Sequence, residues 1–199
     1  MSRTRHPSIP RAGAVLRGRR GIAAIEFALF APVAILLMLV TADMITYLRV
    51  RLTLDQTASS IASVVSQYAQ LFDGDFVDLF ASTQTIAGST PVIGANGRTI
   101  LSGIVNTGSG PTIAWQQSSS GSGAFASKFG TVGSAPTLPD SFAVPGGSTV
   151  IAAEVFTKIT PWLFSVNLMP ASAGVEQRAY AIVQPRVATL ATITPGTRP

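Results

Sequence analysis

Hydrophobic and polar positions divide the chain into stretches of different texture, and the most apolar one comes early. From residue 22 to residue 40 the sequence IAAIEFALFAPVAILLMLV contains nineteen residues whose only charge is Glu26. As a helix rising about 1.5 Å per residue, this run is roughly 28 Å long, close to the thickness of a bilayer's hydrocarbon core. We therefore predict a transmembrane helix over 22–40.

The helix is predicted to continue past the membrane as an amphipathic segment over 41–72, because apolar residues recur there at spacings of three and four on a polar background. The stripe consists of Leu54, Ala58, Ile61, Val65, Tyr68 and Phe72. It packs on the chain's own C-terminal domain or on a partner helix in an assembly, and the pattern itself does not distinguish the two. Asp73, Gly74 and Asp75 are expected to end the helix, with Asp75 as N-cap of a short second helix over 76–82.

Residues 73–199 change to short β-rich runs separated by Gly, Ser and Pro. Asn96–Gly97 predicts a hairpin turn between runs at 90–95 and 98–105, and a third strand follows the turn NTGSG. Residues 118–147 are expected to form a long loop or partly ordered excursion. Two better strands, 149–159 and 175–183, close the domain, and an exposed Glu154–Arg178 pair could join them. The predicted fold class is α+β: a long N-terminal helix, half transmembrane and half amphipathic, followed by a small antiparallel β-rich domain.

Charge changes the picture at the N-terminus. Of the fourteen basic residues, six lie in the first twenty positions, and the chain beyond Gly21 has a formal net charge of −1 (8 basic, 9 acidic). A nucleic-acid-binding domain would carry its positive charge on a folded face, so nucleic acid is not an expected partner. The arginines make residues 1–21 a basic leader, and the positive-inside bias places this leader in the cytoplasm and the C-terminal domain outside it.

Candidate chemistry in the outer domain is sparse. The chain has no cysteine, and its single histidine, His6, lies in the leader, so no His-based triad or His/Cys metal site is expected there. The acidic residues Asp73, Asp75 and Asp78 lack the spacing of a calcium loop. We expect no enzyme activity, no metal and no cofactor.

The junction RRGIAAIEF is where chemistry is predicted. Gly21, preceded by arginines and followed by an apolar helix, offers a protease an extended and accessible bond to Ile22. A carboxylate within an apolar run is costly, so Glu26 needs a role. After cleavage the new amino group of Ile22 would lie four residues away on the same helical face, or Glu26 could pair with a neighbouring subunit's N-terminus. The alternative is that Glu26 only snorkels to the membrane interface. Pro32 is predicted to kink the helix, as a functional bend or as a tolerated proline.

The segment RRGIAAIEFALFAPVAILLMLV resembles the N-terminus of the TadE-like family, pilin-like proteins of the tight-adherence (Flp) pilus system. The resemblance lies in its glycine (Gly21), its Glu26–Phe27 pair and its proline six residues after the glutamate, Pro32. It is specific over about residues 18–60.

The resemblance implies a pilin-like fold and cleavage by a dedicated prepilin peptidase between Gly21 and Ile22. It implies assembly through Glu26 and Phe27, and a role in building a pilus that supports adherence and biofilm formation. The implied partners are that peptidase, other pilin-like subunits, the inner-membrane assembly platform and the lipid bilayer. The protein would be a minor pilin-like subunit in the bacterial inner membrane. The alternative is a signal-anchored binding or adhesion domain outside the cytoplasm that is not cleaved.

Overall fold

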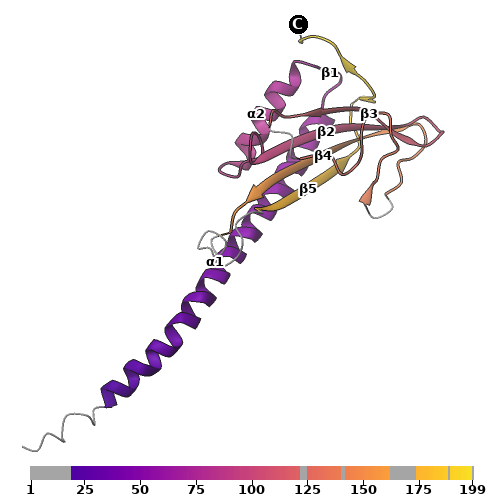
Figure 1. Cartoon of the computed structure of the whole chain (residues 1–199). Coiled ribbons are helices and arrows are strands. Elements are labelled where there is room, and N and C mark those ends of the chain that lie inside the picture. Colours follow the sequence, from indigo (N-terminus) through magenta and orange to yellow (C-terminus); the bar gives the residue numbers. More distant parts are fainter. Residues whose placement is uncertain (1–18, 122–124, 140–141, 162–173, 188, 199) are drawn as a thin grey trace, which may run out of the picture. The chain divides into compact units, whose positions relative to one another are not determined.

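A computed structural model describes residues 19–121, 125–139, 142–161, 174–187 and 189–198, with side chains from Ile22 onward (Figure 1). The chain divides into two compact units, Met1–Ala42 and Asp43–Pro199. Most of the predicted leader, residues 1–18, lies outside the described residues. In the first unit the described chain is entirely helical, and the second contains the sheet.

Helix α1 (Arg19–Ser66) begins in the first unit, where its apolar side chains are exposed. Among the described residues, α1 is the one helix long and apolar enough to cross a membrane, and none of its most apolar window is buried. By length and composition, α1 is therefore consistent with the predicted single membrane-spanning anchor. Pro32 lies inside α1, and the helix continues through it.

In the second unit α1 carries the predicted stripe into the core. Leu54, Ala58, Ile61 and Val65 are all fully buried, so the stripe packs on the chain's own domain. The helix ends at Ser66, however, and not at residue 72 as predicted. The carbonyl of Ser66 accepts a hydrogen bond from the backbone N–H of Arg186, 2.9 Å away. This distant segment satisfies a carbonyl that a longer helix would have used itself.

Two short elements, β1 and α2, follow α1 in the chain. The two-residue strand β1 (Leu71–Phe72) pairs in parallel with β6 (Ile193–Thr194). Helix α2 (Asp75–Ala87) is longer than the predicted 76–82 and ends at Gly88, whose φ of 61° suits a residue without a Cβ atom. The prediction for Asp75 is wrong: Gly74 occupies the N-cap position, and no side chain caps the helix.

The sheet has four antiparallel strands in the order β3-β2-β4-β5. They are β2 (Gly97–Asn106), β3 (Pro111–Ser118), β4 (Ser148–Ile159) and β5 (Val175–Val183). The predicted hairpin around NTGSG and the two closing strands are confirmed, as is the α+β class. The predicted strand at 90–95 is wrong, because Val92 N–H bonds the Gln84 side chain of α2 and Asn96 O accepts the Lys158 N–H.

Both faces of the sheet are covered, which buries β4 from Thr149 to Thr157. On one face Ile151, Ala153 and Leu101 pack with α1 and α2. On the other face the segment between β3 and β4 supplies the cover. Its described part has little regular structure, yet three of its apolar side chains are buried against β2 and β4: Phe125, Phe129 and Val144. The predicted excursion is therefore a packed layer of the core.

Candidate functional site

The first candidate site is the junction at the start of α1. The structure places Arg19, Arg20 and Gly21 in helical backbone, so the Gly21–Ile22 bond lies within the first turn of α1 and not in an extended segment. Arginine is a good helix former, and no residue of RRGIAA other than Gly21 disfavours a helix. A protease that needs an extended bond must therefore unwind this turn. Helix ends lack half of their internal hydrogen bonds and open readily, so the requirement is modest.

Ile22 and Glu26 lie four residues apart in continuous helix, hence on the same face, as the sequence predicted. Both side chains are exposed, and 64% of the Ile22 side chain is open to its surroundings. Glu26 is within reach of an amino group on residue 22 or of a group on another molecule. The intact chain has a peptide N–H at Ile22 and so offers no positive charge there.

Phe27 and Pro32 lie on the same exposed stretch. Phe27 is 74% exposed, so it is free for contact with lipid or with another helix. Pro32 lacks an N–H, which leaves the carbonyl of Ala28 without its usual partner in the helix. The structure thus presents the predicted junction residues along one helical segment.

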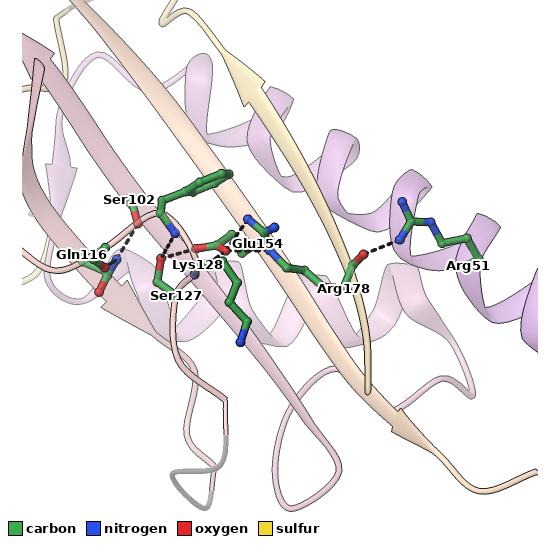
Figure 2. Close-up of polar contacts among 9 residues, drawn as sticks. Arg51, Ser102, Gln116, Ser127, Lys128, Glu154 and Arg178 are labelled. Atoms are coloured by element: carbon green, nitrogen blue, oxygen red, sulfur yellow. Dashed lines mark hydrogen bonds and ion pairs between the residues drawn. The ribbon is translucent and has the colours of Figure 1, made fainter. Parts of the chain in front are cut away.

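The second candidate site is a buried polar cluster between β4, β5 and the loop after β3 (Figure 2). Glu154 is fully buried, and its Oε1 lies 2.8 Å from both Nε and Nη2 of Arg178. The backbone N–H of Lys128 donates to the same oxygen at 3.0 Å, and the Ser127 hydroxyl donates to Oε2. Both carboxylate oxygens therefore have donors, which is the condition for burying such a charge.

Arg178 is held on several sides. Its guanidinium carbon lies 4.8 Å from the ring centre of Phe129 and 5.0 Å from that of Tyr180. The carbonyl of Arg178 accepts a hydrogen bond of 2.5 Å from Arg51 of α1, which also pairs with Asp55. These contacts connect the loop after β3 with β4, β5 and α1. The cluster can therefore hold the loop against the sheet.

The sequence predicted that Glu154 and Arg178 meet, and the contact is confirmed, but the prediction of an exposed pair is wrong. Across the strands Glu154 is opposite Tyr180 and Arg178 is opposite Phe156, so the pair is diagonal. Strand alternation places Glu154 on the face that the loop covers. Ser127 and Lys128 were missed because nothing in a Ser- and Gly-rich segment indicates which backbone N–H will meet a strand 26 residues later.

Among the acidic residues at 73–78, Asp75 has a structural role. Asp75 accepts the backbone N–H of Phe72 at 3.0 Å and pairs with Arg198 at 3.3 Å. In the part of the chain that the structure describes, no three His, Cys, Asp or Glu side chains are grouped closely enough to hold a metal ion.

Together these features define a protein with one apolar helical segment and a small α+β unit on the same chain. The model of one protein family, described as TadE-like protein, matches residues 21–63. The resemblance that the N-terminal residues indicated is thereby confirmed over that segment, which contains the junction and most of α1. The family indicates involvement in assembly of the tight-adherence (Flp) pilus. No curated protein and no solved structure matched the chain.

Proposed function

We propose that this protein is a minor pilin-like (pseudopilin) subunit that helps to assemble a tight-adherence pilus, in a structural role without turnover. The observation that carries the proposal is the position of Glu26, four residues from Ile22 on an exposed helical face, within the segment that matches the TadE-like family. In this proposal a prepilin peptidase cuts between Gly21 and Ile22. The new amino group then gives Glu26 a partner, in its own chain or in a neighbouring pilin-like subunit.

The proposal places the chain in the bacterial inner membrane with its N-terminus in the cytoplasm. Six arginines precede the apolar run, and this excess supports the orientation. The inner-membrane assembly platform and other pilin-like subunits are the proposed partners. Adherence and biofilm formation would follow from the pilus and not from a catalytic activity of this chain.

Identification of the mature N-terminus by mass spectrometry tests the proposal most directly. We expect the chain isolated from cells that contain the peptidase to begin at Ile22, and a Gly21→Leu variant to keep its leader, because a bulky side chain obstructs the scissile bond. Gly18→Leu is the matched control, since it makes the same change three residues earlier and should leave cleavage intact. Wild type and Gly21→Leu of equal mass would refute cleavage at this bond.

Topology is tested separately. A reporter that is active only outside the cytoplasm, fused after Pro199, should be active, and neutral replacements of Arg17, Arg19 and Arg20 should reduce that activity. A C-terminus that stays protected when protease is added to intact spheroplasts would contradict the proposed orientation.

One observation favours a second function. The Gly21–Ile22 bond lies in helix, so an uncleaved chain needs no unwinding there. An uncleaved, signal-anchored binding or adhesion domain outside the cytoplasm is therefore the alternative, and a mature chain that retains its leader while reaching the surface would establish it.

A further inference from the structure

The part of α1 that opens the second unit carries exposed apolar side chains. Between Asp43 and Thr53 the exposed fractions are 62% for Met44, 49% for Leu48 and 69% for Leu52, and Ile45 and Tyr47 are also open. A solvated helix surface is seldom this apolar over three consecutive turns. This set, Met44, Ile45, Tyr47, Leu48 and Leu52, is called the collar below.

The collar is not part of the domain's own core. Met44, Leu48 and Leu52 recur every four residues and so share one face of the helix. Val50 and Leu54, which pack into the core cluster with Val155 and Ala179, lie on the other side of α1. The second unit therefore covers one side of α1 and leaves the face of Met44, Leu48 and Leu52 open. Tyr47, three residues before Val50, lies toward the covered side but is still 45% exposed.

The collar has a sharp upper limit. Around Leu52 the exposed side of α1 becomes polar: Arg51 precedes Leu52, Asp55, Gln56 and Ser59 follow it, and the Arg51–Asp55 ion pair lies on the collar's own face. A partner helix packed along α1 would need an apolar face that continues through these positions. An apolar face that stops within one turn is what a boundary between lipid and water requires.

The residues at this limit are those that suit a lipid surface. Tyr47 and Arg49 are exposed, and amphipathic aromatic and long cationic side chains are favoured at the level of the headgroups. Arg49 also lines a hollow of about 540 Å³, whose other lining residues are the apolar Val50 and Leu52 and the hydroxyl-bearing Thr46, Thr53, Ser89 and Thr90. A cation beside hydroxyl groups is complementary to a phosphate, and the apolar residues suit the lipid next to it.

We propose that the collar and Arg49 lie in the headgroup layer of the membrane on the side of the folded unit, so that this unit rests directly on anionic phospholipid. The collar continues the apolar run 22–40 without an intervening polar stretch longer than Thr41–Asp43. From Met44 to Leu52 a helix rises about 12 Å, compared with about 5–8 Å for one headgroup layer, so the collar also reaches the edge of the hydrocarbon. The predicted span boundary at residue 40 moves outward accordingly.

The proposal rests on the membrane-anchor part of the proposed function and not on the role in pilus assembly. It is testable because the chain has no cysteine. Single cysteines at Met44, Leu48 and Leu52 can each carry an environment-sensitive fluorophore. Leu36→Cys, within the apolar run, is the control for the anchor, and Val77→Cys, 72% exposed on α2, is the control for water.

The full-length variants are reconstituted in phosphatidylglycerol–phosphatidylcholine vesicles that contain lipid with a nitroxide on the headgroup or deep in the acyl chain. We expect headgroup nitroxide to quench the three collar positions several-fold more than Val77→Cys, and acyl-chain nitroxide to quench Leu36→Cys most. Arg49→Gln should weaken headgroup quenching at Leu48→Cys in these vesicles, whereas Lys128→Gln, which changes an exposed lysine elsewhere, should not.

The outcomes separate the possible failures. If Leu36→Cys is quenched no more than Val77→Cys, the anchor itself is refuted. If Leu36→Cys is quenched but the collar behaves like Val77→Cys, this inference alone is overturned. Protection of the collar from aqueous iodide without nitroxide quenching, together with disulfide formation between Leu48→Cys chains, would assign the collar to a second copy and also overturn it. Unchanged quenching with Arg49→Gln would remove the phosphate contact from the proposal.

Discussion

The two units contain the same apolar residue types, but one unit exposes them along α1 and the other buries them in its core. Between Ile22 and Val40 the large apolar side chains of α1 are exposed, apart from the half-buried Leu39, whereas between Leu54 and Val65 those of the stripe are fully buried by the same chain. Each unit also contains one glutamate among apolar neighbours. Glu154 has donors on both oxygens within its own unit, whereas Glu26 lies exposed on the helix. The folded unit thus buries the stripe and satisfies Glu154 internally, whereas the first unit leaves its apolar side chains and Glu26 exposed.

The largest expected effect is on the buried charge of the folded unit. Arg178→Leu should destabilise this unit by about 3–5 kcal/mol, because it leaves the fully buried Glu154 carboxylate without its cation. Denaturant unfolding in detergent, followed by the fluorescence of buried Trp115, measures the loss. Lys128→Ala is the control, since its side chain is exposed and only its backbone N–H contacts Glu154. A loss below about 1 kcal/mol would mean that the pair behaves like a surface ion pair.

The buried stripe should be sensitive to truncation. Ile61→Ala removes a side chain from the core cluster between α1 and the sheet, and should cost about 2–5 kcal/mol. Val64 lies three residues after Ile61 in the same helix but is 39% exposed, so Val64→Ala should cost well under half as much. The same unfolding measurement compares the two. Equal losses would show that α1 does not pack on the sheet as described.

A substitution in the exposed apolar run should affect membrane insertion and leave the stability of the second unit unchanged. Ile35→Arg should disfavour membrane insertion by about 2.5–3.5 kcal/mol, because a charge near the middle of a spanning helix loses its hydration. The mid-point of denaturant unfolding of the second unit should not change, since Ile35 lies in the other unit. Fractionation of membranes after carbonate washing reports insertion. An Ile35→Arg chain that stays in the membrane fraction at wild-type level would contradict a span centred there.

Local sequence signals predicted the elements whose partners are close in the chain. The β2–β3 hairpin follows from NTGSG, and the boundaries of β5 agree with the predicted 175–183. The stripe from Leu54 to Val65 was equally readable, since its period of 3.6 needs only one helix and one buried face.

The features that sequence did not predict depend on distant partners. Helix α1 ends at Ser66, whose carbonyl accepts a hydrogen bond from Arg186, 120 positions later in the chain. Leu71 and Phe72 continue the stripe's apolar pattern, but they form strand β1 with the C-terminal β6. The burial of Glu154 depends on the loop after β3, whose Gly- and Ser-rich sequence has no period. The turn-like composition of the segment between β3 and β4 therefore gave no indication that it covers one face of the sheet.

The smallest and most specific expected effect concerns Glu26. Glu26→Gln keeps the size and helix propensity of the side chain but removes the charge that would pair with a new amino group on Ile22. Insertion should be unchanged or slightly improved, and cleavage should proceed. A hydrogen bond to a charged group contributes about 1.5–3 kcal/mol, so its loss should shift an assembly equilibrium at least several-fold.

Counting surface pili by electron microscopy, at matched protein levels, measures that shift, and Glu176→Gln, which neutralises an exposed carboxylate on β5, is the control. We expect few pili with Glu26→Gln and normal numbers with Glu176→Gln. Combining Glu26→Gln with Gly21→Leu should add no further defect, because an uncut chain has no amino group at Ile22 to lose. Normal piliation with Glu26→Gln would leave Glu26 with no role beyond snorkelling. The contrast between Glu154, which is paired within its own unit, and Glu26, which is proposed to pair with an N-terminal amino group, would then no longer hold.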